Sequence, residues 1–508
     1  MTGHRRDPGH AATRVLVSLG WNYGAAIVTT FLQLGYAAWT GRIASTEAFG
    51  AYAIALTVTQ LVGYLSNGGL ATHVLRVDQL TGPVVRAAMR LGTAYGVVAF
   101  TVLQSVASWC GALWQMPTLP LMLRVLGCQL LVQPGAAVAI TALRRIGLVR
   151  AAVTCELTAQ AGGVAVGTAL LACGWKSFGL AAAQPATAML TVALGLLVIV
   201  VRSPIPDGSP VRSRDLVMPS GLLAGYGLLE FVTSNAPMWV VGRVFGAGVT
   251  GAYSRANVVT GLTSQFLFQG LNSAATPALA ERRRQGLEGA PAVAHVVCSA
   301  SAAALIGFGA LAGIGPTALH VLLGGGWDMA SELVPLLAAG AAATLLCRSG
   351  MIIDQVCHAT RALLRTQIAA AAVTAAAVCA ALVWQSLLLL TAAGAMGQVA
   401  GHIVQVVGWQ RQGLVHASFV VRAHVVHGLV GAALGAAAMC GTFGRPPTSG
   451  LVCGLAFMVP VVLVCTLVRR RIPVYAAAVA MGLCPSPRAG HRAGPLDYVA
   501  LSEHAEGR

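Results

Sequence analysis

The feature that most constrains the fold of this chain is a segment that occurs twice, 201 residues apart. Residues 41–55 read GRIASTEAFGAYAIA, and residues 242–256 read GRVFGAGVTGAYSRA. The two copies align without a gap, and each lies between the first and second long apolar runs of its part of the chain. A duplicated pair of membrane helices is typical of transporters built from two halves around a central path. A chance match in an Ala- and Gly-rich chain is the alternative.

The chain has too few charges to cover a water-exposed surface. Charged residues make up 9% and apolar residues 56%, whereas a soluble domain carries about 25% charged residues. The net charge of +17 does not indicate nucleic-acid binding, because the basic residues lie between apolar runs instead of along one face. The cysteines are scattered singly, with no CxxC pair and no Cys/His ligand spacing. We therefore predict a polytopic membrane protein with no metal and no cofactor.

Fourteen apolar runs have about the 20 residues that a spanning helix needs. They are 15–39, 51–72, 91–114, 119–143, 151–174, 179–201, 216–241, 251–278, 293–315, 330–356, 367–389, 391–409, 424–442 and 449–468. The basic segment before the first run leads into a run too long for a signal peptide, so we expect an uncleaved first helix. The fold class is therefore all-α, with about 14 transmembrane helices.

The basic residues indicate how the chain is oriented. With a cytoplasmic N-terminus, 25 of the 32 Lys and Arg residues fall on the cytoplasmic side and four outside, as the positive-inside rule requires. Both termini are then cytoplasmic in a multi-pass protein of the plasma membrane. The Pro-, Ser- and charge-rich linker 202–215 separates two lobes, 15–201 and 216–409, of six spans each. We expect a pseudo-two-fold axis along the membrane normal to relate them.

Three further segments complete the predicted domain organisation. Residues 1–14 form a cytoplasmic N-terminal segment, and 424–468 add two spans to the repeat. Residues 469–508 form a cytoplasmic tail, in which the short apolar stretch 474–484 lies at the membrane interface. The glycine-rich stretch GFGALAG (307–313) and the pair Gly431/Gly435 predict close helix packing, because no strand precedes the glycines as in a phosphate loop.

Ionisable side chains within spans are costly and usually face a cavity. A guanidinium group binds phosphate oxygens in pairs, so the arginines suit an anionic substrate. The candidate path residues are Asn22, Arg124, Asn235, Arg255, Asn257 and Arg348. The candidate coupling or gating residues are Pro219, Glu230, Pro237 and Asp354, where the two prolines flank Glu230 and allow bending. Alternatively, Arg124 and Arg255 reach the outer interface, and Arg348 only neutralises Asp354.

Residues 20–76 resemble the opening of the Wzx-type polysaccharide flippases, a branch of the superfamily that includes MATE multidrug exporters and lipid II flippases. The resemblance is carried by the loop from Arg42 to Phe49-Gly50, by Gly68-Gly69-Leu70 and by Arg76. Residues 241–262, 272–284 and 325–341 are similar to later family segments. The resemblance implies a two-lobed bundle that opens alternately to each side. Its substrate would be a glycan on a polyprenyl diphosphate, and the cationic lumen of the family carries over only to Arg124, Arg255 and Arg348.

We therefore expect a flippase and not an enzyme, with membrane lipids and a lipid-linked glycan as partners. A polysaccharide polymerase or glycosyltransferases are possible further partners, and nucleic acid is not. Three alternatives remain open at this point. They are a cation-coupled exporter of drugs or amphiphiles, a membrane glycan polymerase or ligase, and an inactive scaffold. The short outer loops count against the polymerase.

Overall fold

The computed structural model describes residues 8–66, 74, 77, 80–202, 221–284, 290–356 and 360–467, and every regular element in these ranges is a helix. The first six are α1 (Pro8–Ile43), α2 (Thr46–Ser66), α4 (Gly82–Trp114), α5 (Leu119–Arg145), α6 (Val149–Ala172) and α7 (Lys176–Arg202). Then come α8 (Gly221–Val244), α9 (Gly246–Arg284), the continuous run α10 (Ala290–Ser301), η2 (Ala302–Ile306) and α11 (Gly307–Leu323), α12 (Asp328–Val356), α13 (Thr360–Val383) and α14 (Leu387–Arg411). The last two are α15 (Ala417–Thr442) and α16 (Pro447–Leu467).

Each predicted span corresponds to one helix of the described chain, with α10, η2 and α11 together at the ninth span. The bounds differ at 367–389, because α13 ends at Val383 and the last residues of that run cross a turn into α14. Ten helices within the described residues meet the length and hydropathy expected of a membrane span. Helices are the expected outcome, because an apolar segment in lipid must satisfy its backbone polar groups internally. The pair 367–409 is two helices, α13 and α14, joined by a turn at residues 384–386.

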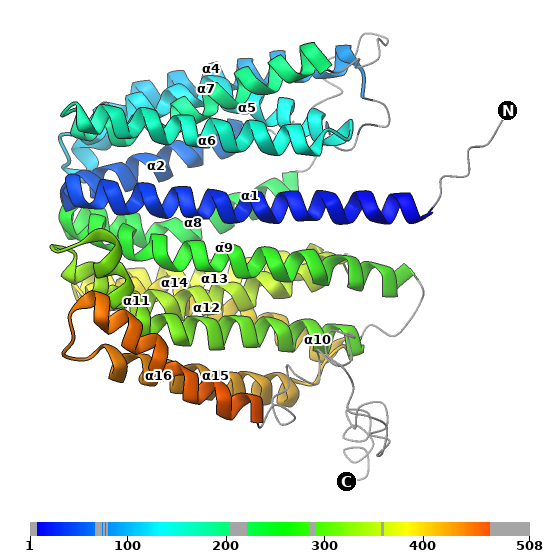
Figure 1. Ribbon diagram of the computed structural model, residues 1–508, viewed down its shortest axis with the longest axis vertical. Helices are drawn as coiled ribbons and strands as arrows, with labels where there is room; N and C mark the ends of the chain where they lie inside the picture. Colours follow the sequence, from blue (N-terminus) through cyan, green and yellow to red (C-terminus); the bar gives the residue numbers. More distant parts are fainter. Residues whose placement is uncertain are drawn as a thin grey trace.

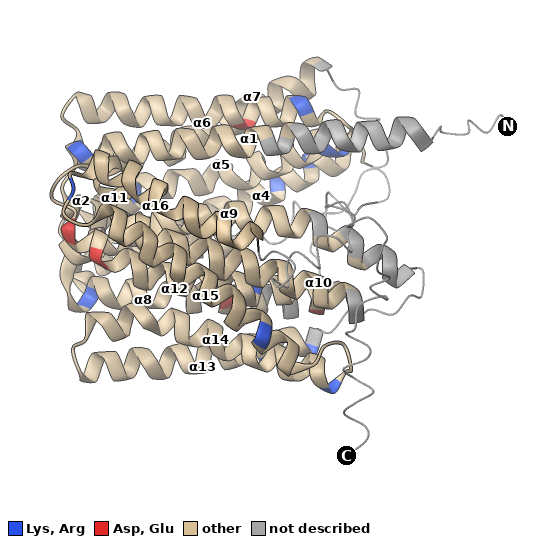
Figure 2. Ribbon diagram, turned by 60° about the horizontal axis from the view of Figure 1, so that its bottom comes forward, with Lys and Arg blue, Asp and Glu red and all other residues tan. Residues whose placement is uncertain are grey.

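The helices lie side by side in one bundle (Figure 1). The first residue of α1 and the last residue of α16 lie at the same end of the bundle, as an even number of spans requires (Figure 1). Lys and Arg residues lie mainly toward the helix ends (Figure 2). The linker 203–215, residues 1–7 and the tail with its stretch 474–484 lie outside the described residues.

The same helix pairings occur in both parts of the chain. In the first part α7 packs against α5 and α6, and in the second part α14 packs against α12 and α13. Likewise α1 packs against α6, and α8 packs against α13. These equivalent pairs are six spans apart, which is the offset that the duplicated segment predicts.

The duplicated segment lies where the two parts meet. Its copies form the starts of α2 and α9, which pack against each other. A Cβ atom on Gly50 would overlap the carbonyl oxygen of Ala247, and one on Gly251 would overlap the carbonyl oxygen of Thr46. The two backbones are therefore in direct contact, and only glycine fits at either position. The sequence repeat is thus a repeat of the residues that let α2 and α9 cross closely.

The two added helices pack on the ninth span, and glycines again set the spacing. On α15, Gly431 lies against the backbone of Leu305, and Gly435 lies against Gly309 and Gly313 of α11. The prediction that the GFGALAG stretch serves helix packing is therefore confirmed. The same contact fixes the position of α15 against the only π-helical turn in the described residues, Ala302–Ile306.

Candidate functional site

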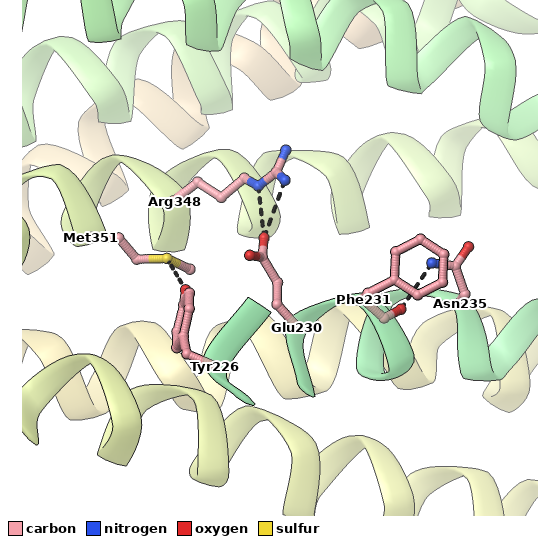
Figure 3. A network of polar contacts seen from close by, with 6 residues as sticks. All are labelled: Tyr226, Glu230, Phe231, Asn235, Arg348 and Met351. Atoms are coloured by element: carbon pink, nitrogen blue, oxygen red, sulfur yellow. Dashed lines mark hydrogen bonds and ion pairs between the residues drawn. The ribbon is translucent and has the colours of Figure 1, made fainter. Parts of the chain in front are cut away.

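An ion pair between two helices of the second part lies at the centre of the candidate site. Arg348 of α12 donates from Nε and from Nη2 to Oε1 of Glu230 on α8, each at 3.1 Å (Figure 3). The side chains are 44% and 23% exposed, so the pair is open on one side. Both residues were singled out from the sequence, and the structure brings them together across 118 positions of the chain.

Aromatic and sulfur-containing side chains surround this ion pair. The Arg348 guanidinium lies 5.7 Å from the ring centroid of Phe268 on α9. One turn before Glu230 on α8, the hydroxyl of Tyr226 contacts the sulfur of Met351 on α12 (Figure 3). Such a wall of rings and a thioether suits an amphiphile, because it offers apolar contact beside a charged centre.

Asp354 does not belong to this ion pair, so Arg348 neutralises Glu230 and not Asp354. Asp354 is buried near the end of α12 and accepts a hydrogen bond of 2.9 Å from the indole nitrogen of Trp409 on α14. Its second carboxylate oxygen has no hydrogen-bond partner among the described residues. Asp354 therefore connects α12 to α14 through its hydrogen bond with Trp409.

Arg255 lies at the α2–α9 crossing, away from the Glu230–Arg348 pair. Its guanidinium lies 4.2 Å from the ring centroid of Phe49, and the side chain is buried. Its Nε has no hydrogen-bond partner among the described residues. A cation over an aromatic face in a dry contact is a strong interaction, so Arg255 holds the two parts together in this conformation.

Arg124 lies on a different surface again. It is exposed, and its Nη2 donates to the hydroxyl of Ser108 on α4 at 3.2 Å. The three arginines therefore do not form one cationic cluster in this conformation. Each has its own partner: a carboxylate for Arg348, a ring for Arg255 and a hydroxyl for Arg124.

The other candidate residues with a described position lie on α1, α8 and α9. On α8, Asn235 donates to the carbonyl of Phe231 within its own helix at 2.8 Å (Figure 3). On α9, Asn257 is exposed. Pro237 is inside α8, whereas Pro219 lies outside the described residues. Asn22 is in α1, and its side chain is outside the described residues.

Two contacts of the site could not have been expected from the sequence. The ring of Tyr64 on α2 stacks on Phe231, next to Glu230, at 6.5 Å between centroids. The indole nitrogen of Trp239 on α8 donates to Thr57 on α2 at 2.9 Å. Both contacts connect α8 to α2 in the first part of the chain. A movement of α8 would therefore break or shift contacts with both parts. The only available signal was that aromatic residues recur along the seventh span.

The site offers charge, hydrogen bonds and aromatic surface, and it holds no cluster of ligands for a metal. Among the described residues, no three or more His, Cys, Asp and Glu side chains are placed to hold a metal ion. The arrangement can bind an anionic group at Arg348 if Glu230 is displaced, because the guanidinium is accessible and stays charged. It can also bind apolar groups along Phe268 and Tyr226.

Comparison with solved structures shows which proteins share this fold. The structure of the lipid II flippase MurJ in an inward closed conformation matches with a TM-score of 0.66 at 10% identity, covering 90% of this chain and 99% of that one. An inward-facing multidrug resistance MATE family transporter matches with a TM-score of 0.58 at 16% identity, covering 78% and 96%. The chain therefore has the MurJ- and MATE-like fold and is a multi-pass membrane protein.

Sequence comparison identifies the family. Residues 41–332 match the family described as Polysaccharide biosynthesis protein, and the chain belongs to this family. A relative is the succinoglycan biosynthesis transport protein ExoT of Rhizobium meliloti (strain 1021), which is 29% identical over 341 residues. The alignment covers 64% of this chain and 66% of that protein, just under two thirds of its length. The matched region begins at the first duplicated segment and contains the second, and it also contains Glu230.

Proposed function

We propose that this protein is a flippase that moves a polyprenyl-diphosphate-linked oligosaccharide across the cytoplasmic membrane for cell-surface polysaccharide synthesis. The observation that carries the proposal is the Glu230–Arg348 pair, an accessible cation in the membrane interior of a chain from a polysaccharide biosynthesis family. The transport role named for the relative ExoT and the MurJ-like fold support the same substrate class.

In the proposed mechanism, a diphosphate exchanges partners with Glu230. The diphosphate oxygens compete for the Arg348 guanidinium, and binding frees the Glu230 carboxylate from its partner. The freed carboxylate is only partly exposed and has lost its counterion, which favours a rearrangement of α8 and α12 while substrate is bound. When the diphosphate leaves on the other side, Glu230 pairs with Arg348 again and the starting arrangement is restored.

The lipid and the sugar would follow different routes in this proposal. The polyprenyl tail stays in the bilayer, while the sugar and diphosphate pass between the two parts of the bundle. The distribution of basic residues supports N- and C-termini in the cytoplasm. In this proposal the glycan is carried from the inner to the outer leaflet. The glycan is then available to a polymerase or glycosyltransferase outside.

The test is transport of a short polyprenyl-diphosphate oligosaccharide by purified protein in liposomes. We expect Arg348→Gln and Glu230→Gln each to lower the rate at least about tenfold, which corresponds to about 1.4 kcal/mol. Arg144→Gln is the matched control, because the Arg144–Glu156 pair has the same chemistry at the exposed end of a helix. Its transport rate should stay at the wild-type value.

Two results would overturn the proposal. The first is no transport of the lipid-linked glycan by wild-type protein while an established flippase works in the same liposomes. The second is efflux of cationic dyes or drugs that depends on Glu230, which would instead support a cation-coupled exporter. Unchanged glycan transport by both site variants would remove the proposed role of the ion pair.

A further inference from the structure

Four side chains outside the candidate site form a hydrogen-bonded chain inside the second part of the bundle. They are Ser301 at the end of α10, His402 on α14, and His424 and His427 on α15. His402 Nε2 lies 3.0 Å from His424 Nε2, and Ser301 Oγ lies 2.9 Å from His424 Nδ1 and 2.9 Å from His427 Nδ1. Ser301 and His427 have no exposed surface.

The four hydrogen-bonded side chains lie within the membrane-spanning part of the helices. His402 is nine residues before the end of α14, which is about 14 Å along a helix at 1.5 Å per residue. His427 is ten residues after the start of α15, or about 15 Å. Three imidazoles in contact at such depth are costly unless every polar atom is satisfied.

The hydrogen bonds determine which nitrogen carries each proton. Gln405 donates from its amide nitrogen to the carbonyl of Cys347 at 3.0 Å, so its amide oxygen faces Nδ1 of His402 at 3.2 Å. His402 must therefore donate from Nδ1, and in the neutral ring its Nε2 accepts. His424 then donates from Nε2 and accepts at Nδ1.

The assignment continues through the serine to the last histidine. Since His424 Nδ1 accepts, the hydroxyl of Ser301 donates to it, and the Ser301 oxygen accepts from Nδ1–H of His427. His427 then has a free lone pair on Nε2. This atom is buried and has no hydrogen-bond partner among the described residues. In the neutral state the three hydrogen bonds that join these side chains all run from His427 toward His402. The one free acceptor is Nε2 of His427.

Nε2 of His427 is the one atom of this neutral hydrogen-bonded chain that is free to accept an extra proton, and a proton bound there can move along the chain without any ring turning. When Nε2 of His427 gains a proton, its Nδ1 proton passes to Ser301, and the Ser301 proton passes to Nδ1 of His424. The Nε2 proton of His424 then passes to Nε2 of His402. Three hydrogen bonds reverse, the positive charge moves from His427 to His402, and the number of protons is conserved at each step.

A small cavity and a π-helical turn lie next to this hydrogen-bonded chain. His402 and His424 line a small cavity between α10, α12, α14 and α15, together with Ser349, Ile353 and Trp409. Ser301 directly precedes the π-helical turn Ala302–Ile306, an irregularity that is frequent at functional sites. Gly431, one turn beyond His427, lies against the backbone of that turn. A charge on His427 would therefore act directly on the contact between α15 and the ninth span.

The ionisable groups on the helices packed around the chain are few within the membrane. Asp354 is bonded to Trp409, whose indole meets the His402 ring edge-on at 6.0 Å between centroids. Glu230 and Arg348 neutralise each other. The other ionisable groups with described side chains on the helices that pack against α10, α14 and α15 are Tyr226, Glu230, Arg243, Tyr253, Arg255, His295, Cys298, His320, Asp328, Glu332, Cys347, Arg348, Asp354, Arg361, Arg365, Cys379, Arg411, Arg422, Cys440, Cys453 and Cys465. Trp409 thus lies between the Asp354 carboxylate and the His402 ring.

We propose that Ser301, His402, His424 and His427 form a proton-binding relay that loads one proton and couples it to the packing of α15 on the ninth span. The use of this proton to drive transport rests on the proposed function, whereas the binding of the proton does not. The relay would give the transporter a proton as its coupling ion, separate from the substrate site at Glu230 and Arg348.

The first experiment measures proton positions without any substrate. Full-length protein with ¹⁵N-labelled histidine in lipid bilayers is studied by solid-state NMR across pH 5 to 8. We expect His402 and His427 to be protonated at Nδ1 and His424 at Nε2 at high pH, with one imidazolium gained among the three on acidification. Three rings with the same tautomer, or three protons gained independently, would overturn the relay.

The second experiment separates the relay from the packing of the helices. Ser301→Ala keeps all three imidazoles but breaks the chain, and Ser301→Thr keeps the hydroxyl. In liposomes with an imposed pH gradient, the gradient-dependent part of glycan transport should be lost in Ser301→Ala and retained in Ser301→Thr. His416→Gln, at an exposed histidine before α15, is the control and should behave as wild type. Transport that ignores the gradient in wild-type protein would overturn the coupling.

The two proposals fail in distinguishable ways. If wild-type protein transports no glycan but the NMR pattern is as expected, the proposed function fails and the proton relay stands. If glycan is transported and the NMR pattern is absent, the relay fails and the flippase proposal stands.

Discussion

Glu230 and Arg348 illustrate what a single pair of residues contributes when it is only partly buried. Removing one partner leaves the other charge without a counterion, whereas removing both restores neutrality. Because the side chains are 23% and 44% exposed, solvent screens the pair, and we expect only about 1 kcal/mol from it. The double variant Glu230→Gln/Arg348→Gln should therefore lose less stability than the sum of the two single variants.

The measurement is thermal unfolding of the three purified variants in one detergent, analysed as a double-mutant cycle. Losses that simply add would mean that the two side chains do not interact in the folded protein. Arg144→Gln again provides a comparison with an ion pair in a solvent-exposed place.

The hydrogen bond from Trp409 to Asp354 gives a second prediction for single residues. Asp354→Ala leaves the indole N–H of Trp409 buried without an acceptor, which costs about 1–3 kcal/mol. Asp354→Asn can still present an oxygen to the indole and should lose clearly less stability. Unfolding followed by tryptophan fluorescence compares the two variants. Equal losses would show that the hydrogen bond does not account for the role of Asp354.

At this scale the sequence indicated which residues matter and not which residues meet. Glu230 and Arg348 were recognised because a charge within an apolar run is costly. Their pairing across 118 positions could not be inferred, because Asp354 is closer to Arg348 along the chain and was the natural partner to consider. The histidine chain was missed because His402, His424 and His427 lie on two helices with Ser301 on a third.

The crossing of α2 and α9 carries a prediction at the scale of helices. Gly50→Ala and Gly251→Ala each place a methyl group on a backbone carbonyl, so the helices must separate. Such overpacking typically lowers the free energy of unfolding by about 1–3 kcal/mol. This loss exceeds the gain of about 1 kcal/mol that alanine has over glycine in helix propensity. Gly261→Ala on α9 meets nothing within 4 Å and should be neutral or slightly stabilising.

Thermal unfolding of the three alanine variants tests this crossing. Similar unfolding temperatures for Gly50→Ala and Gly261→Ala would show that the two helices do not touch at Gly50. Because Gly50 and Gly251 occupy equivalent places, the losses in their two variants should be alike.

The helices themselves follow closely from the apolar runs, and their ends do not. The run 251–278 predicts a span, but α9 continues to Arg284, because the residues that follow the run, LAERRR, are all strong helix formers. Similarly α1 begins at Pro8, within the segment expected to precede the span. The π-helical turn at Ala302–Ile306 has no signal in the hydropathy pattern, since it depends on how α15 packs against it.

The orientation of the whole molecule gives a prediction that chemical labelling can check. In a variant without its native cysteines, Gln385→Cys in the α13–α14 turn should react with an impermeant maleimide added outside intact cells. Gln412→Cys, in the turn after α14, should react only after the membrane is permeabilised. Both positions are exposed, so access and not burial decides the result. The reverse pattern would mean that the distribution of basic residues gives the wrong orientation.

For the molecule as a whole, the sequence predicted the all-α membrane fold, and the comparisons confirm it. The apolar runs determine the number of helices, and the duplicated segment indicates two similar parts. The division into two lobes with a linker at 202–215 stays a prediction, because residues 203–220 lie outside the described chain. How the parts move relative to each other depends on a second conformation, which no sequence pattern specifies.

The crossing at Gly50 and Gly251 has a consequence for the history of this chain. Gly50 meets Ala247 and Gly251 meets Thr46, so each contact becomes the other when 201 is added to or subtracted from the residue numbers. This is the isologous geometry of a homodimer, in which a surface binds its own copy. A single half, made as a separate polypeptide, would therefore carry a self-complementary patch.

Within one chain, by contrast, the two copies of that patch can differ. The residues equivalent to Arg255 and Phe49 are Ile54 and Thr250. One side of the α2–α9 crossing therefore holds a cation on an aromatic ring, and the equivalent place on the other side is uncharged. A dimer of identical halves cannot hold such a difference, because each residue would occur at both places.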